Sequence, residues 1–154
     1  MAKLRYQANG FIPITNPPAR RQMPAAKVAI VKGDALHDDG NGYATNATTA
    51  FAATFLGIAA ADCDNSGGDA GDLNVEYYPV DITTRYRVPV AANALITQTA
   101  VGTIVDLEAN DDIDISDTTI AAGPGFFIDA IDASADAVDA NTYGYAIGHF
   151  AYVS

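Results

Sequence analysis

Turn signals recur about every ten residues along most of this chain, and short apolar runs lie between them. Clear examples are the pairs Gly33-Asp34 and Asn41-Gly42 and the triplet Gly123-Pro124-Gly125. This spacing is typical of β-sandwiches and barrels, because a helix needs a longer uninterrupted run with a period of 3.6 residues. The sequence therefore predicts an all-β fold, a single β-sandwich or barrel domain.

The runs between these turns have the composition of strands. In Thr84–Val90, Tyr86 and Val88 alternate with arginines, which predicts one buried and one exposed face. Thr48–Ala53 could make one helical turn, and Asp132–Asn141 could be a short helix or a wide acidic loop. No internal repeat is convincing. The other predicted strands are Lys27–Lys32, Ala35–His37, Phe55–Ala60, Leu73–Tyr78, Gly102–Leu107, Ile113–Ile115, Phe126–Ile131 and Tyr143–Val153.

The first 26 residues differ from the rest. They hold four of the seven prolines, which favours extended, irregular backbone. They also carry apolar side chains that favour burial, unlike a disordered tail. We expect an extended N-terminal arm over residues 1–26 and a β body over residues 27–154. The arm can lay its apolar side chains on a neighbouring protein, or it can fold back over one end of its own body.

Charge divides the chain in the same way. The net charge is −11, yet the first 33 residues contain six lysines and arginines and no acid. All 19 acids lie after residue 33, where only Arg85 and Arg87 are basic. An acidic body repels phosphate groups, so nucleic acid is not expected as the main partner.

Other whole-chain features narrow the class of protein further. The 154 residues suggest one domain. No apolar run reaches the roughly 18–20 residues that span a bilayer, so no membrane partner is expected. The N-terminus lacks the apolar stretch of a secretory signal, which favours synthesis in a cytoplasm. The single cysteine, Cys63, excludes an intrachain disulfide framework.

The segment Asp62–Leu73, DCDNSGGDAGDL, begins like a calcium-binding loop. Asp62, Asp64 and Ser66 alternate, and Gly67 stands where such a loop turns sharply. The twelfth position is nevertheless leucine rather than a bidentate glutamate, and the predicted flanks are strands rather than helices. We therefore expect a solvated acidic turn. Weak cation binding at Asp62–Asp72 stays open.

No group of residues predicts catalysis or a cofactor. In Asp111–Asp117, DDIDISD, the acids alternate with isoleucines, as on a half-exposed strand. His37 and His149 lie far apart in the sequence. The thiolate of Cys63 is disfavoured by two flanking aspartates. We expect a protein that is not an enzyme and has no cofactor or metal site.

The order of these elements resembles the decoration proteins, also called cement or stabilisation proteins, of tailed-virus (bacteriophage-type) capsids. The resemblance covers residues 27–154, and the proline-rich arm and the acidity depart from it. The segments that carry it are AIVKGDAL, FLGIAAAD, VEYYPVDITTRYRVPV, VGTIVDLEANDDIDIS, GFFIDAID and YGYAIGHF.

The resemblance implies a structural virion protein on the capsid exterior that binds the major capsid protein and stabilises contacts between its subunits. Such proteins are commonly homotrimers. The arm would then bury apolar residues on a neighbour and pair its arginines with acids. The arm residues expected to bind the capsid or a partner are Arg5, Tyr6, Phe11, Ile12, Ile14, Arg20, Arg21 and Met23.

Two other functions remain open at this point. The first is a receptor- or carbohydrate-binding β module of the head-fibre or adhesin type. Its usual signature, a row of exposed aromatic rings, is weak in a chain without tryptophan. The second is a small β hydrolase or lyase that uses the acidic loops. It would need a carboxylate whose pKa is raised within a cleft.

Overall fold

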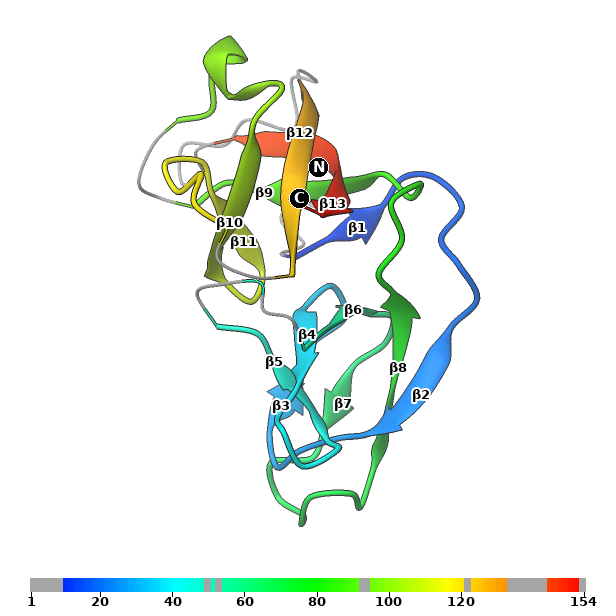
Figure 1. Cartoon of the computed structure of the whole chain (residues 1–154). Coiled ribbons are helices and arrows are strands. Elements are labelled where there is room, and N and C mark those ends of the chain that lie inside the picture. The colour runs from blue at the N-terminus through cyan, green and yellow to red at the C-terminus, as the bar shows by residue number, and fades with distance from the viewer. Residues whose placement is uncertain are drawn as a thin grey trace, which may run out of the picture.

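The fold is built almost entirely from strands and turns, as the computed structural model shows (Figure 1). Within the described residues the strands form sheets of six, five and two strands, with one short 3-10 turn, η2 (Gln98–Ala100). The all-β prediction is confirmed. No described helix is long and apolar enough to cross a membrane. The structure describes residues 10–48, 51, 54–91, 95–120, 123–132 and 144–152.

The five-stranded sheet closes into a small barrel, which we call the first barrel. Its strands lie in the order β2-β8-β6-β4-β5. A parallel bridge between Ala25 and Ala44 joins the end of β2 to β5 and closes the ring. Two short strands, β3 (Ala29–Ile30) and β7 (Cys63–Asp64), pair beside it. The barrel strands are β2 (Arg21–Pro24), β4 (Ala35–Asp38), β5 (Ala44–Asn46), β6 (Phe55–Ala59) and β8 (Asn74–Pro79).

The six-stranded sheet contains a second barrel, which also has five strands. Its order is β1-β9-β13-β12-β10-β11, and a parallel bridge between Val90 and Ile113 joins β9 to β11. The extra strand, β1 (Ile12–Pro13), lies on the outer edge of β9. The five strands of the second barrel are β9 (Tyr86–Pro89), β10 (Ile104–Ala109), β11 (Asp112–Asp114), β12 (Pro124–Ile131) and β13 (Tyr145–Tyr152).

The two barrels have one topology. Taken in chain order, the strands of each are arranged first, fifth, fourth, second, third, and the first meets the third again through its parallel bridge. The registers also match. Arg21 opposite Tyr77 corresponds to Tyr86 opposite Gly148. Every pairing of β6 with β8 recurs between β12 and β13, so that Tyr78 corresponds to His149.

Individual backbone hydrogen bonds repeat as well. Gly33 N donates to Ala59 O, and its counterpart Gly102 N donates to Ile128 O, at 2.9 and 2.8 Å. Both glycines have positive φ, 98° and 89°, in a turn that leads into the second strand of each barrel. Ala26 N donates to Ala44 O, and Ala91 N donates to Ile113 O, both at 2.9 Å. The chain is therefore an internal structural repeat.

This repeat corrects the sequence analysis, which found none. Few equivalent positions have the same residue type in both barrels. The identical pairs include Arg20 and Arg85, Pro24 and Pro89, and Gly33 and Gly102. Barrel topology depends on backbone pairing and on alternation of buried and exposed positions, and many side-chain sets satisfy both. A repeat of this kind therefore leaves little trace in the amino-acid sequence.

A single aromatic core holds the barrels together. Phe150, fully buried, contacts the rings of Phe51 and Phe55 at 5.5 and 5.1 Å. Phe51 and Phe55 come from the first half of the chain, while Phe150 belongs to β13. Phe11, which precedes β1, lies in the same cluster. The first barrel has its own smaller core of Ala25, Ile30, Leu36, Ala44, Ala59, Cys63, Val75 and Tyr77.

Most predicted strands are present with shifted ends. The β4–β5 hairpin turns through Asn41-Gly42 as expected. Lys27–Lys32 is a strand only at β3. The N-terminal boundary at residue 26 is not a structural boundary. β1 and β2 belong to the two sheets, so the described part of the predicted arm, residues 10–26, is built into the barrels.

The physical reason is burial, because Phe11 fills the aromatic core and β2 completes the first barrel. Of the two predicted helical turns, Thr48–Ala53 is described only at residues 48 and 51. Asp132–Asn141 lies outside the described residues beyond Asp132.

Candidate functional site

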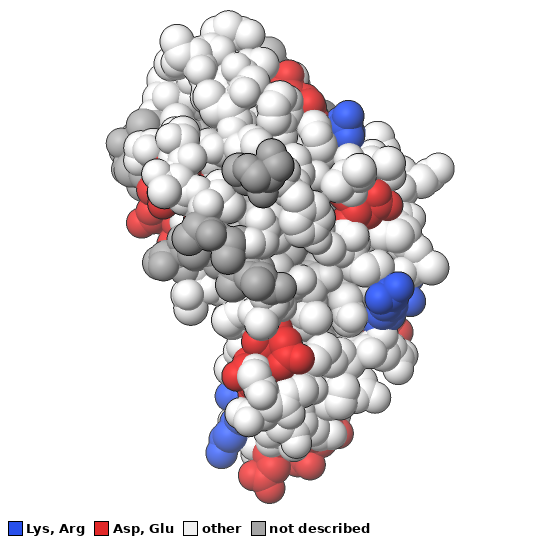
Figure 2. Space-filling model, viewed as in Figure 1, with Lys and Arg blue, Asp and Glu red and all other residues white. Residues whose placement is uncertain are grey.

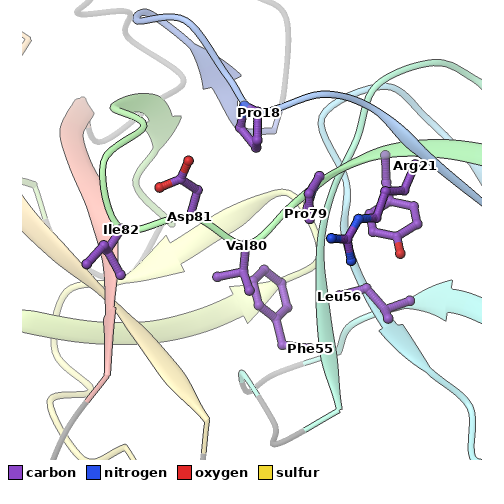
Figure 3. A pocket seen from close by; sticks show the side chains of 9 residues that line it. Pro18, Arg21, Phe55, Leu56, Pro79, Val80, Asp81 and Ile82 are labelled. Carbon is purple, nitrogen blue, oxygen red and sulfur yellow. The ribbon is translucent and has the colours of Figure 1, made fainter.

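A surface groove lies beside β2, where the first barrel meets the linker to the second. Its volume is about 630 Å³. Figure 3 shows Arg21 and Leu56 at one end and Asp81 and Ile82 at the other, with Phe55 and Val80 between them. The lining is mostly apolar, with one guanidinium and one carboxylate. The full set is Pro18, Arg21, Phe55, Leu56, Tyr77, Pro79, Val80, Asp81 and Ile82.

The carboxylate in this groove already accepts hydrogen bonds from within the chain. Asp81 Oδ1 accepts hydrogen bonds from the backbone N–H and the hydroxyl of Thr83, at 2.7 and 2.8 Å. These bonds lower the pKa of Asp81, so it stays charged well into the acid range. The guanidinium is different. Within the described part of the chain, Arg21 forms no ion pair, and it is exposed.

Arg20, next to the groove, is already paired. Its Nη1 lies 3.1 Å from Glu76 Oε2, and its guanidinium lies over the ring of Tyr78, 5.5 Å from the centroid. Figure 2 shows a basic patch on the side where β2 runs in Figure 1, with acidic atoms at its edge. The arrangement can bind an apolar group and, through Arg21, a carboxylate.

The expected partner-binding residues do not form one surface. Phe11 is buried within the chain itself. Ile12 is half-buried in β1, and Met23 packs against the small core of the first barrel. Ile14 is 48% exposed. Arg5 and Tyr6 lie outside the described residues.

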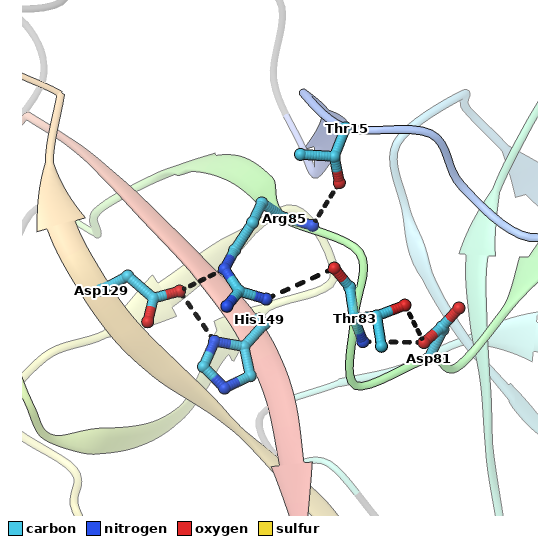
Figure 4. A network of polar contacts seen from close by, with 6 residues as sticks. All are labelled: Thr15, Asp81, Thr83, Arg85, Asp129 and His149. Carbon is cyan, nitrogen blue, oxygen red and sulfur yellow. Dashed lines mark hydrogen bonds and ion pairs between the residues drawn. The ribbon is translucent and has the colours of Figure 1, made fainter.

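A polar network lies on the matching side of the second barrel (Figure 4). Asp129 Oδ2 is 2.9 Å from Arg85 Nε and 2.7 Å from His149 Nδ1. The backbone N–H of Arg85 donates to Thr15 Oγ1 at 2.9 Å. Arg85 and His149 are the counterparts of Arg20 and Tyr78, so both barrels place an arginine beside an aromatic side chain of the fifth strand. The network connects β12 and β13 with the residue that precedes β9 and with the segment after β1.

Buried carboxylates form a feature that the sequence analysis missed. Asp106 is 3% exposed and accepts bonds from Phe51 N and Leu107 N at 2.6 and 2.8 Å. Burial raises its pKa. Burial also raises the pKa of Asp34, 5% exposed, to about 6, although its bond from Val31 N opposes the shift.

Asp112 was expected to be solvated, and it is instead partly buried. Burial, reinforced by the neighbouring Asp111 carboxylate, raises the pKa of Asp112 to about 6. The alternation that predicted this segment is otherwise confirmed, because Ile113 is fully buried. The signal for buried acids was weak, since each of these aspartates lies in a sequence crowded with other aspartates.

The acidic loop Asp62–Leu73 uses its carboxylates to stabilise turns. Asp64 Oδ1 accepts from Ser66 N at 3.0 Å, and Asp72 Oδ2 accepts from Asp69 N at 2.9 Å. Asp62 Oδ1 accepts from Lys32 N at 2.7 Å. Across the described ranges, no group of three or more His, Cys, Asp or Glu side chains is placed to hold a metal ion.

Comparison with known proteins adds no assignment: no protein-family model matches the chain, and no curated protein is significantly similar to it in sequence.

Proposed function

We propose that this protein is a non-catalytic structural protein of a virus particle. It binds the outer surface of the capsid and stabilises contacts between major capsid protein subunits, as a homotrimer. The sequence segments that resemble capsid decoration proteins support this role. The resemblance lies in the β-strand and turn segments, from AIVKGDAL to YGYAIGHF.

The structural observation that carries the proposal is the duplicated barrel. A shared aromatic core joins two modules of one topology, so each chain holds two modules of similar backbone arrangement together. A capsid offers identical subunits at fixed separations. Two related modules in one rigid chain can contact neighbouring subunits together, and paired contacts raise the overall affinity through effective concentration.

Exposed apolar side chains on this surface could be buried against a capsid subunit. Ile82 is 58% exposed beside the groove, and Ile14, 48% exposed, follows β1. Burying such a side chain fully contributes roughly 1.5–3 kcal/mol before ordering costs. The remaining exposed large apolar residues among those described are Val31, Leu73, Leu95 and Tyr152.

Co-sedimentation with empty capsids of the source virus tests the proposal. The full chain should bind saturably, and Ile82→Asp should weaken binding while the melting temperature stays unchanged. Val31→Asp, at a similarly exposed residue away from the groove, is the matched control. A chain that does not sediment with capsids contradicts the proposal. Binding to a glycan array would then favour the receptor- or carbohydrate-binding alternative.

A further inference from the structure

In the second barrel, an extended segment is added as a short strand to the barrel's edge. β1 lies on the outer edge of β9, with Ile12 opposite Arg87 and Pro13 opposite Tyr86. Ile14 N continues the ladder by donating to Arg85 O at 2.9 Å. Phe11, just before β1, inserts beside Tyr86 and Phe150, with ring centroids 6.2 and 5.6 Å away. This end of the barrel is therefore closed by an extended segment that carries an aromatic anchor.

The first barrel has the same edge without the added strand. Arg20, Arg21 and Gln22 are the counterparts of Arg85, Tyr86 and Arg87. Ala25 N donates to Leu73 O on the β8 side, so by alternation the N–H and C=O of Gln22 face the outer edge. Among the described residues, β2 pairs with β8 alone over Arg21–Pro24.

The space that Phe11 fills in the second barrel also has an open counterpart. Two of the residues that Phe11 contacts, Tyr86 and Phe150, correspond to Arg21 and Pro79. Arg21 and Pro79 line the 630 Å³ groove. An unpaired edge and an open groove thus occur together in the first barrel, at the positions where the second barrel holds an added strand and its anchor.

We propose that the outer edge of β2 and its groove accept an extended segment of a partner protein, which adds as a strand, inserts an apolar side chain and pairs a carboxylate with Arg21. Strand addition obtains affinity from backbone hydrogen bonds and specificity from pockets for side chains. Proline limits the ladder at the same place in both barrels, because Pro24 and Pro89 have no N–H to donate. The acceptor edge is therefore short, from Arg20 to Gln22.

Charge identifies the chemistry of the occupant. Tyr86 in the second barrel is replaced by Arg21 in the first, and Arg21 has no ion-pair partner among the described residues. Arg20 beside it is already paired with Glu76, so the uncompensated positive charge at this edge is that of Arg21. The chain's own first nine residues carry Lys3 and Arg5 and no acid, so another copy's N-terminus would be repelled. An acidic, extended segment of a different protein fits best.

A synthetic peptide tests this site without any capsid. The probe copies residues 10–15, GFIPIT, with glutamate in place of Pro13, the residue that faces the Tyr86 position. It should bind the full-length protein saturably and slow hydrogen exchange of the Gln22 amide. Two control peptides carry lysine in place of the glutamate, or alanine in place of the phenylalanine. Each control should bind about tenfold more weakly, a factor that corresponds to about 1.4 kcal/mol.

Protein variants distinguish the contribution of the β2 edge to peptide binding from that of the Arg21 charge. Gln22→Pro removes the outward N–H and should abolish peptide binding without changing the melting temperature. Arg21→Glu should reverse the preference between the glutamate and lysine peptides. Lys27→Glu makes the same charge change at an exposed residue outside the groove, and it should leave binding unchanged.

Several results would overturn the inference. One is the absence of binding by all three peptides. Another is binding that persists in Gln22→Pro, or an unchanged peptide preference in Arg21→Glu. Self-association in sedimentation equilibrium that Gln22→Pro abolishes would assign the edge to a second copy instead. These results are independent of capsid co-sedimentation, so failure here and failure of the capsid role are distinguishable.

Discussion

The two barrels solve the same folding problem with different side chains. The second barrel is filled by aromatic rings, with Tyr86, Phe126 and Phe150 pointing inward. The first barrel is filled mainly by small aliphatic residues, such as Ala25, Ala44 and Ala59. The two barrels therefore share their backbone register, while the size of the side chains that fill each core differs.

One exchange between the barrels is reciprocal. Phe126 of β12 corresponds to Gly57 of β6, and Gly148 of β13 corresponds to Tyr77 of β8. Each barrel thus has one aromatic residue and one glycine at this level, on opposite strands. A Cβ on Gly148 would lie 2.1 Å from Phe127 O and 2.6 Å from Phe126 Cε2, so the adjacent backbone and the phenylalanine ring both require the glycine. Large and small residues alternate so that the interior stays filled.

The barrels also differ in what covers their outer edge. β9 is covered by β1, while β2 is uncovered among the described residues. Exposed edges invite pairing with another chain. One barrel therefore has a covered outer edge, and the other has a short outer edge that is uncovered among the described residues and lies beside a groove. The predictions that follow alter one barrel at a time and use the other as the reference.

The largest effect should come from the aromatic core. Phe150→Ala removes a ring that contacts five others, so unfolding should become about 3–5 kcal/mol easier. Because this core contains residues of both barrels, urea unfolding should stay a single transition. Circular dichroism and tyrosine fluorescence measure it. Two separated transitions in the variant would mean that the barrels are independent units.

The next effect tests the glycine of the first barrel. Gly57→Ala places a Cβ 1.9 Å from Tyr78 O on a residue with φ of 148°, which should destabilise the fold by about 2–4 kcal/mol. Gly102→Ala is the control, since its Cβ meets nothing within 4 Å and only the positive φ, 89°, is unfavourable. It should cost about 1 kcal/mol. Equal losses in chemical denaturation would show that steric contact at Gly57 is unimportant.

Sequence patterns predicted the strands because alternation and turns are local. The predicted burial of Tyr86 and Val88 is confirmed. Of the arginines that alternate with them, the Arg85 side chain is 38% exposed, whereas that of Arg87 is only 15% exposed. Asn41-Gly42 predicted the hairpin because Asn and Gly tolerate positive φ. In the structure the positive φ angles at the tip belong to Gly40 and Gly42, and Asn41 has none. Such features need only neighbours in the chain.

The arm, the repeat and the buried acids depend on distant contacts. β2 carries Arg21, Gln22 and Pro24, a composition that does not predict a strand, and it forms because β8 and the Ala25–Ala44 bridge complete its pairing. The groove could not be predicted either. It joins Arg21 to Phe55 and Ile82, which are separated by long stretches of sequence. Its lining also contains no cysteine or histidine that could have drawn attention to it in the sequence.

A third prediction concerns pH. Asp34 has a pKa of about 6 in the folded protein, above the unfolded value of about 3.9. The folded state therefore binds more protons between these values, and this group's stabilisation, present below pH 4, is lost as the pH rises through 6. We expect a decrease of about 2 kcal/mol from Asp34 over this range. Urea unfolding at a series of pH values measures it.

The second barrel supplies the variant that tests the pH prediction. The counterpart of Asp34 is Thr103, whose hydroxyl donates to Ala100 O at 2.6 Å. Asp34→Thr should flatten the pH dependence between pH 4 and 6. Asp34→Asn, which keeps an acceptor for Val31 N–H, should flatten it equally. A wild-type slope in both variants would assign the titration to another carboxylate, with Asp112→Asn as the next variant.

The smallest effect compares the two matched arginines. Arg85 joins Asp129 and lies beside His149, with the Asp129 side chain 27% exposed, so Arg85→Ala should cost about 0.5–1 kcal/mol. Arg20 pairs with Glu76 on an open surface, where water and salt screen the contact, so Arg20→Ala should leave the melting temperature unchanged. Thermal unfolding at low and high salt measures both. Equal losses would contradict the difference, because they would mean that the two barrels hold their surfaces together with the same electrostatic strength despite unequal exposure.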